Sequence, residues 1–390
     1  MIRHQAEGCH LVGHRGVFGL VNNGWAGVSS GWYIDDVTVT SPWKGYARRH
    51  MLRFSKLHQF TLTPAKLAWP WVAFTPARTA FVVPEGPTTL ALRGVDSLGD
   101  VRQVELSEGL AVPSVAANPS GTTSRQPGLH AMALHPDGRT VVGFGWHDDG
   151  PAACIARVGE APELVDLTPA LGQLGPMAAT FTRDGEYLWV SAESSSQAAL
   201  LRLRLRGLVL EARATFSPPP PPAAHELFLH PAEDAVLLTM ACGQDGTFLQ
   251  VARMVGEKLA LVVTEGDGVV EPCGLAEATD DGGRVCLVAA ERVELRRWPD
   301  LVREAELELP EELLANYNGV RIGGRFLVSA ADQDDEGHER AVVLSDALGL
   351  VEIAPALSGM WAGRLGKDRL VTLAREKTDR RLGFVYRVEG

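Results

Sequence analysis

The 390-residue sequence lacks a hydrophobic run of the kind that crosses a membrane. No stretch reaches the roughly eighteen consecutive apolar residues that a spanning helix requires. At the N-terminus, Arg3, His4 and Glu7 precede any apolar stretch, a pattern that does not fit a secretory signal peptide. We therefore expect a cytoplasmic protein that does not act at a membrane.

Cysteine and positive charge are also scarce. The five cysteines are far apart and never form a Cys-x-x-Cys pair, so we expect reduced, mostly buried thiols rather than a disulfide framework. Lys and Arg number 37 against 48 Asp and Glu, which gives a formal net charge of -11. Because nucleic-acid binding needs a surplus of cations on one face, the charge balance predicts no nucleic-acid partner.

Helical patterning is missing as well. No stretch longer than about ten residues keeps an apolar 3.6-residue period between recognisable caps, so the sequence predicts scarcely any helix. The 41 glycines and 24 prolines suit a fold with many turns. These features favour an all-β class.

What the sequence does contain is a repeat, which is clearest in residues 129–158. An apolar strand runs into the turn His135-Pro136-Asp137-Gly138, a second strand leaves through Val141, and a third closes at Val158. Comparable turns at residues 137, 184, 233, 281, 323 and 367 are 42 to 49 residues apart. An all-strand period in the forties, with four strands a unit, is typical of β-propeller blades.

One unit adds a detail about exposure. Leu201, Leu203 and Leu205 alternate with Arg202 and Arg204 in its third strand. Strict alternation predicts a strand with one face in water.

The segment from His135 to Val142, and less closely Thr182 to Val190, resembles the blade signature of WD40-like and YVTN-type bacterial β-propellers. The resemblance implies a β-propeller over residues 53–390. With the turn Pro76-Ala77-Arg78 the turns number seven, which predicts an all-β, seven-bladed β-propeller of four-stranded blades, with eight blades as the alternative. The resemblance implies little about function, because propellers host many unrelated activities. We expect a protein-binding platform or scaffold; the alternatives are a hydrolase of the YVTN lactonase type and a structural subunit of a larger complex.

Residues 1–52 are irregular, Gly-rich and aromatic. Asn22-Asn23-Gly24 predicts a hairpin turn in this segment. We expect an N-terminal extension that either packs on a rim of the ring or supplies an outer strand beside the C-terminal one. Its tryptophans, Trp25, Trp32 and Trp43, form a predicted second contact element.

Several motifs that resemble catalytic or metal sites have simpler interpretations. Gly27 to Gly31 fits a Gly-x-Ser-x-Gly elbow, but a strand follows where a helix is needed. His225 and His230 are five residues apart on a predicted strand, so their side chains should point to opposite sides and cannot share a zinc ion. The acidic run from Asp332 lacks the last ligand of a calcium loop. We expect no catalytic residues, no metal and no cofactor.

A set of acidic loops is the remaining candidate site. We expect the loops joining the third and fourth strands of the units to emerge on one face and to carry a binding surface for a basic partner. Lys377, Arg380 and Arg381 interrupt this set in the last unit. The predicted binding residues are Asp148, Asp149, Asp332, Asp334 and Asp335. The alternative is that these charges only keep the protein soluble.

Overall fold

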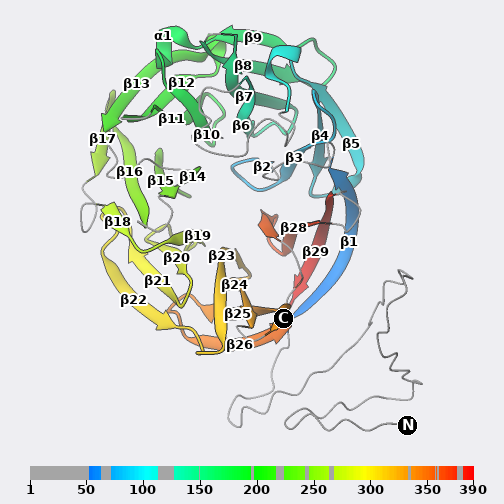
Figure 1. Cartoon of the computed structure of the whole chain (residues 1–390), viewed down its shortest axis with the longest axis vertical. Helices are drawn as coiled ribbons and strands as arrows, with labels where there is room; N and C mark the ends of the chain where they lie inside the picture. Colours follow the sequence, from blue (N-terminus) through cyan, green and yellow to red (C-terminus); the bar gives the residue numbers. More distant parts are fainter. Residues whose placement is uncertain are drawn as a thin grey trace. The chain divides into compact units, whose positions relative to one another are not determined.

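The computed structural model describes residues 52–62, 72–112, 127–148, 150–194, 197–216, 224–241, 246–262, 268–332, 335–355, 357, 360–375 and 381–390. The described strands form seven antiparallel sheets that are arranged as blades in a ring (Figure 1). This arrangement is a seven-bladed β-propeller. It confirms the predicted all-β class and the preferred number of blades.

Six blades consist of strands that follow one another in the sequence, from the inner strand at the centre of the ring to the outer strand at the rim. Blade 1 comprises β2 (Ala73–Phe74), β3 (Ala80–Pro84), β4 (Thr89–Gly94) and β5 (Ser97–Glu105). Blade 2 comprises β6 (Gly128–Leu134), β7 (Thr140–His147), β8 (Gly150–Arg157) and β9 (Glu163–Asp166). Blade 3 comprises β10 (Gly175–Phe181), β11 (Tyr187–Glu193), β12 (Ala198–Arg204) and β13 (Val209–Phe216).

The next three blades repeat this order. Blade 4 comprises β14 (Ala224–Leu229), β15 (Ala235–Ala241), β16 (Thr247–Val255) and β17 (Lys258–Val262), with the short β18 (Val269–Val270) also paired to β16. Blade 5 comprises β19 (Cys273–Ala278), β20 (Arg284–Ala289), β21 (Arg292–Arg297) and β22 (Arg303–Glu308). Blade 6 comprises β23 (Leu313–Ile322), β24 (Arg325–Asp332), β25 (Asp335–Ser345) and β26 (Leu350–Pro355).

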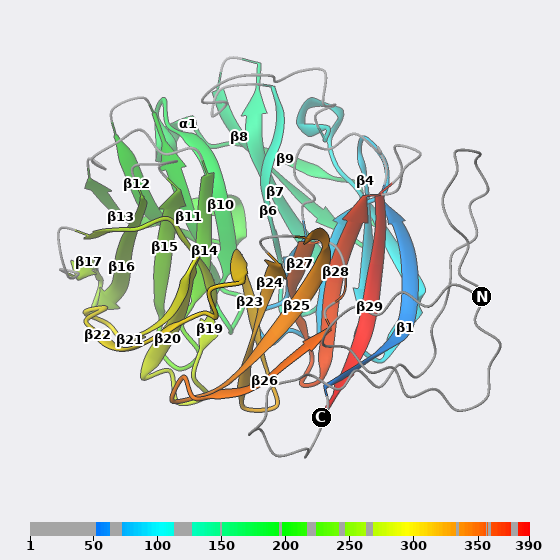
Figure 2. The ribbon, with the colours of Figure 1, turned by 60° about the horizontal axis from the view of Figure 1, so that its bottom comes forward.

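The seventh blade is assembled from both ends of the ring. Its strands β27 (Met360–Leu365), β28 (Arg369–Arg375) and β29 (Arg381–Glu389) come from the C-terminal end, and β1 (Arg53–Leu62) supplies the outer strand. Strands β1 and β29 lie side by side in Figure 2, with a register that runs from Arg53 opposite Glu389 to Leu62 opposite Arg381. The outer strand thus begins one residue after the segment that was predicted as an extension.

The turns between inner and second strands follow a local hydrogen-bond rule. In blade 3, the Thr182 hydroxyl donates to Asp184 at 2.6 Å, and Thr279 donates to Asp281 at 2.6 Å in blade 5. The glycine that follows each aspartate has a positive φ, 75° at Gly185 and 71° at Gly282, which glycine adopts without a steric cost. The repeated Asp-Gly pairs in the sequence therefore mark these turns.

Seven hydrophobic clusters form the core, one at each seam between neighbouring blades. The cluster between blades 2 and 3 includes Phe144 and Leu201, and the cluster between blades 7 and 1 includes Val385 and Phe81. Each blade is therefore covered on both faces. This packing contradicts the predicted wet face of the third strand in blade 3, because Arg202 is buried at 8% exposure against blade 4.

Arg202 is tolerated at this seam because both of its terminal nitrogens have carboxylate partners. Its guanidinium stacks over the Tyr187 ring at 3.5 Å, forms an ion pair with Glu211, and donates to Asp234 of blade 4 at 2.6 Å. The same Asp234 accepts a hydrogen bond from the Trp189 indole at 3.0 Å. A buried arginine thus joins two blades.

Helix is nearly absent from the described residues, as predicted. It is limited to α1 (Thr168–Leu171) and the 3-10 turns η1 (Glu108–Leu110) and η3 (Arg206–Leu208). No helix in the described part of the chain has the length and apolar character needed to cross a membrane.

Candidate functional site

The ring has two faces, which differ in the connections that they carry. We call the side with the inner-to-second and third-to-outer turns the turn face. The opposite side, with the second-to-third loops and the connections between blades, is the loop face. The acidic loops of the sequence analysis join second and third strands, as β7 to β8 shows at Asp148, so the predicted position between third and fourth strands was wrong. They still share one face, because such loops all emerge on the same side.

Asp148 is the predicted acidic binding residue whose side chain the structure describes. Its side chain is 82% exposed, and its carboxylate lies 3.3 Å from Nδ1 of His147. His147 in turn packs against Gly109 of η1, where an added Cβ would lie 1.9 Å from the imidazole ring. The loop that carries Asp148 is thus anchored to the connection from blade 1.

The other predicted residues lie partly or wholly outside the described part of the chain. The backbones of Asp332 and Asp335 are described, but their side chains are not, and Asp149 and Asp334 fall outside the described residues. The tryptophans Trp25, Trp32 and Trp43 and the hairpin turn at Asn22-Asn23-Gly24 also fall outside them.

Exposed carboxylates occur around the described parts of the loop face. They belong to five connections between strands or blades. Besides Asp148, they are Glu105, Glu108, Glu271, Glu291, Glu308, Glu311 and Glu312. Among the cations there, Arg292 forms ion pairs with Glu271 at 2.9 Å and Glu294 at 2.8 Å. The described loop face therefore carries a surplus of negative charge that sequence reasoning found only in part.

A histidine, a serine and a glutamate meet between blades 3 and 4. Nε2 of His225 lies 3.0 Å from the Glu193 carboxylate, and its Nδ1 lies 3.1 Å from the Ser191 hydroxyl. These residue types form hydrolase triads elsewhere. Here the Ser191 residue is 0% exposed and the His225 side chain is also enclosed, so no substrate reaches the hydroxyl. The three residues tie two blades together.

His225 and His230 point to opposite neighbours, as predicted. His225 faces blade 3, whereas His230 stacks on Trp298 of blade 5 at a centroid distance of 4.5 Å. Nε2 of His230 donates to the Gly282 carbonyl at 2.8 Å, and Nδ1 accepts the backbone N–H of Glu233. The two imidazoles cannot share a metal ion. Within the described residues, no cluster of three or more potential ligands is placed to hold one.

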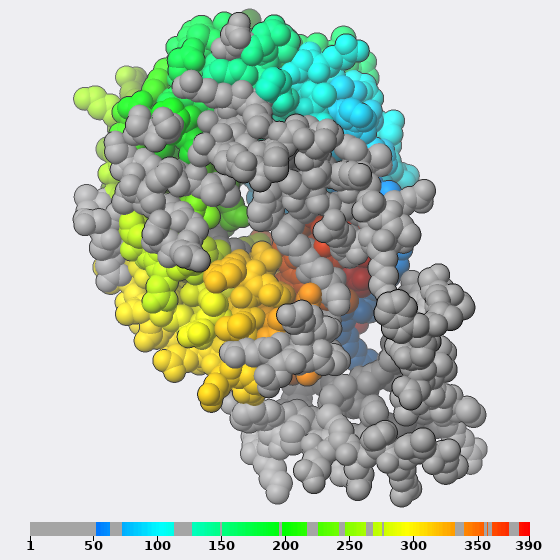
Figure 3. All heavy atoms as spheres, in the orientation of Figure 1, coloured from blue at the N-terminus to red at the C-terminus, as the bar shows by residue number. Residues whose placement is uncertain are grey.

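The central channel is lined by residues from all seven inner strands and has a volume of about 420 Å³. An opening near the middle of the ring is visible in the space-filling view (Figure 3). The described lining contains seven charged residues: Arg78, Arg183, Glu226, Glu277, Asp280, Arg321 and Arg364. No histidine belongs to this lining, so the geometry offers the hydrolase alternative no general base of that type among the described residues.

Two sets of ion pairs hold some of these charged side chains in place. Arg364 of blade 7 donates from Nε to the Glu277 carboxylate of blade 5 at 3.1 Å, a contact that skips blade 6. Arg321 of blade 6 donates to Asp280 of blade 5 and, from Nη2, to Asp346 at 2.8 Å. Burial lowers the pKa of Arg321, but the hydrogen bonds that its guanidinium donates to both carboxylates outweigh burial and raise that pKa overall. The Arg321 hydrogen bond lowers the pKa of Asp280.

Three charged side chains of the channel have no hydrogen-bond or ion-pair partner among the described residues: those of Arg78, Arg183 and Glu226. Arg78 lies over the Phe74 ring at 4.7 Å. Burial lowers the pKa of Arg78, while the Glu277 carboxylate acts in the opposite direction. The Glu226 residue is exposed to water inside the channel. Desolvation by the surrounding protein nevertheless raises the pKa of its carboxyl group. Sequence reasoning missed all of these residues.

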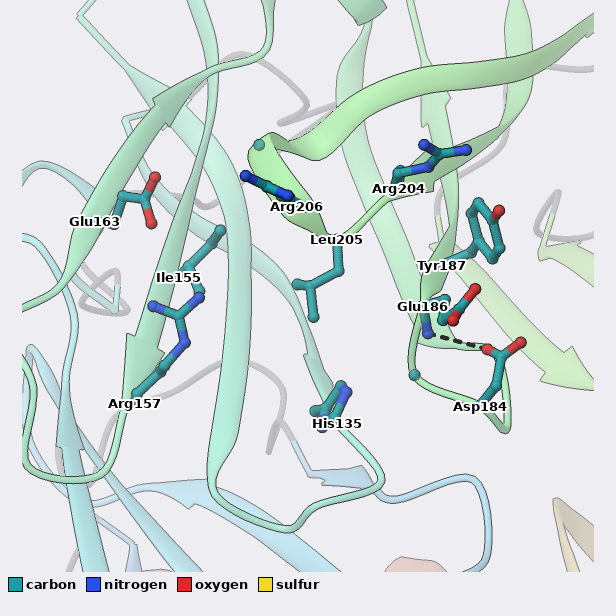
Figure 4. Close-up of a pocket in the computed structure, with 12 residues that line it drawn as sticks. His135, Ile155, Arg157, Glu163, Asp184, Glu186, Tyr187, Arg204, Leu205 and Arg206 are labelled. Carbon is teal, nitrogen blue, oxygen red and sulfur yellow. Dashed lines mark hydrogen bonds between the residues drawn. The ribbon is translucent and has the colours of Figure 1, made fainter.

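A larger cavity of about 750 Å³ opens on the turn face between blades 2 and 3. Figure 4 shows Arg157 and Glu163 on one side of it and Leu205 and Arg206 on the other. Arg157 also pairs with Glu160 at 3.5 Å. Because charges of both signs alternate along this pocket, it has no clear preference for a ligand of one charge.

Comparisons with known proteins agree with this architecture. No protein-family model matches the sequence, and no curated protein matches it. One similar solved structure is the β-propeller domain of Cps50 (Swd1) from Myceliophteria thermophila, with 11% identity, a TM-score of 0.50, and coverage of 84% of this chain and 99% of that one. Another is the WD40 repeats of RRP9, with 11% identity, a TM-score of 0.52, and coverage of 86% and 100%. At this identity the likeness shows the fold alone, a WD40-like propeller, and the YVTN type stays a prediction.

Proposed function

We propose that the chain is a cytoplasmic protein-binding platform whose loop face docks a basic protein partner. The observation that carries the proposal is the surplus of exposed carboxylates on that face, including Asp148 on its anchored loop. A set of like charges on one rim raises the encounter rate with an oppositely charged partner and orients its approach. The packed ring supports this role, since its interblade cores hold the ends of the described strands in place.

The N-terminal aromatic segment is a second contact element in this proposal. Aromatic side chains are enriched among the residues that contribute most to protein–protein affinity. Trp25, Trp32 and Trp43 would add short-range contacts after the acidic face has attracted the partner.

The test uses a fluorescent oligolysine peptide as the basic probe. A variant with Asp148, Asp149, Asp332, Asp334 and Asp335 changed to Lys should lose binding, measured by fluorescence anisotropy at low salt. The matched control reverses five exposed carboxylates elsewhere: Asp96, Glu160, Glu186, Glu257 and Glu304. It has the same net charge, so it should retain most of the affinity if the loop face is the site.

Salt provides the second arm of the test. Binding to the wild-type protein should weaken as the Debye length shortens to about 8 Å at physiological ionic strength. Equal losses in both variants would show that only the overall charge matters, and would refute a docking face.

A further inference from the structure

The turn-face end of the channel holds more cations than its carboxylates can neutralise. Aligning the ends of the inner strands places Arg321 and Arg364 at the same repeat position, one residue before the strand ends in blades 6 and 7. Arg78 and Arg183 lie in the turns of blades 1 and 3 and line the same cavity. Four guanidinium groups therefore gather at one mouth, against three carboxylates, those of Glu277, Asp280 and Asp346.

Arg321 is the only one of the four described arginines with two carboxylate partners, Asp280 and Asp346. Arg364 uses Nε for Glu277 and Nη1 for the Gly366 carbonyl, at 3.0 Å. The Arg78 guanidinium donates no hydrogen bond to the described residues. Arg78 and Arg364 both interact electrostatically with Glu277, so two guanidiniums share a single carboxylate.

The position of Arg78 is set by its surroundings. Its backbone carbonyl accepts the Gly366 N–H at 2.7 Å, which ties the turn of blade 1 to blade 7. An added Cβ at Gly363 would lie 3.4 Å from Nη1 of Arg78, so the guanidinium passes close to the backbone of β27. Arg78 and Arg364 are thus held on the same side of the mouth.

The remaining carboxylate of the channel, Glu226, lies two residues deeper along its strand than Glu277 and makes no ion pair with the described arginines. Glu226 precedes His230, the first residue of the blade 4 turn, by four residues. At about 3.3 Å per residue, this separation places Glu226 roughly 13 Å from the turn face. Among the described residues, three carboxylates therefore serve four guanidinium groups at this mouth, and the guanidiniums of Arg78 and Arg183 have no ion-pair partner of their own.

We propose that the turn-face mouth of the channel binds an oxyanion group, a phosphate or a carboxylate, through Arg78 and Arg364, with Arg183 as a third cation. Guanidinium groups donate two parallel hydrogen bonds to such oxygens. The cavity has room for a small anion, and its partial enclosure strengthens the attraction relative to bulk water. This site is separate from the loop face and independent of the platform function.

Titration calorimetry with inorganic phosphate, at constant ionic strength in chloride, tests the proposal. The wild-type protein should bind one phosphate in a saturable manner. Arg78→Gln should weaken binding about tenfold or more, the loss expected for a charge-assisted contact. Arg139→Gln is the matched control, because Arg139 is exposed on the turn face of blade 2 and does not line the channel.

Succinate, tested in the same way, distinguishes the two sources of oxygen ligands. Binding of phosphate alone assigns the site to phosphate-bearing ligands, and binding of succinate alone assigns it to carboxylates. Either result supports the proposal only if the Arg78→Gln variant binds the same anion more weakly than the wild type. Circular dichroism of each variant checks that the ring is folded. Arg183→Gln is a second variant at an exposed position, for use if Arg78→Gln does not fold. Absence of saturable binding for both anions, or wild-type affinity in the folded variant, overturns the proposal.

Discussion

Gly282 should be one of the least replaceable residues of the ring. It has a φ of 71° in the turn of blade 5, and an added Cβ would lie 2.3 Å from Nε2 of His230. His230 is 2% exposed, stacks on Trp298 and donates to the Gly282 carbonyl, so its ring has little freedom to move. Replacing Gly282 by alanine therefore imposes two separate costs.

The first cost is the left-handed backbone, about 1–2 kcal/mol for a residue with a Cβ. The second is the forced displacement of His230, about 1–3 kcal/mol by analogy with overpacked cores. Together they predict a loss of about 2–5 kcal/mol in the free energy of unfolding. Gly256 is a matched control, since its φ is 61° and nothing lies within 4 Å of an added Cβ. Gly256→Ala should cost only the first amount.

Urea titration followed by tryptophan fluorescence would measure both variants. A double variant, Gly282→Ala with His230→Ala, should lose less stability than the sum of the single variants, because the steric conflict is absent. If Gly282→Ala proved no more destabilising than Gly256→Ala, the proposed contact between the blades would be incorrect.

Further variants probe the buried charges. Glu277→Gln should cost about 1–3 kcal/mol in thermal or urea unfolding, because Arg364 loses its carboxylate across the channel; an unchanged midpoint would show that the contact contributes nothing. Asp234→Ala should cost about 1–2 kcal/mol, since Glu211 still partners the buried arginine of blade 3. Burial alone would raise the pKa of Glu294, but hydrogen bonds from neighbouring arginines lower it below its ordinary 4.5. The stability that Glu294 contributes should therefore be full above about pH 4.5 and lost as pH falls through the lowered pKa. The difference in unfolding free energy between wild type and Glu294→Gln should shrink in that range, and a difference that grows on acidification would contradict the assignment.

The sequence was sufficient to predict the repeat, because the turns of blades 2, 3 and 5 are local: a threonine or histidine, an aspartate and a glycine form hydrogen bonds within a few residues. It could not predict the exposure of Arg202, since alternation shows which side chains share a face but not what covers that face. In this ring both faces of every blade pack against a neighbouring blade. The channel site was also hidden, because Arg78 and Arg364 are far apart in the sequence and meet only when the ring is closed.

The pairing of β1 with β29 has a consequence for synthesis of the chain. Strand β1 leaves the ribosome first, but the strand that accepts its hydrogen bonds is completed only at residue 389. Until then, the edges of β1 and β29 are unpaired and the seam residues Phe81 and Val385 remain uncovered. During translation the nascent chain is thus an open row of blades with an unpaired strand at each end. Binding of a chaperone, or pairing with a second nascent chain, competes there with closure of the ring.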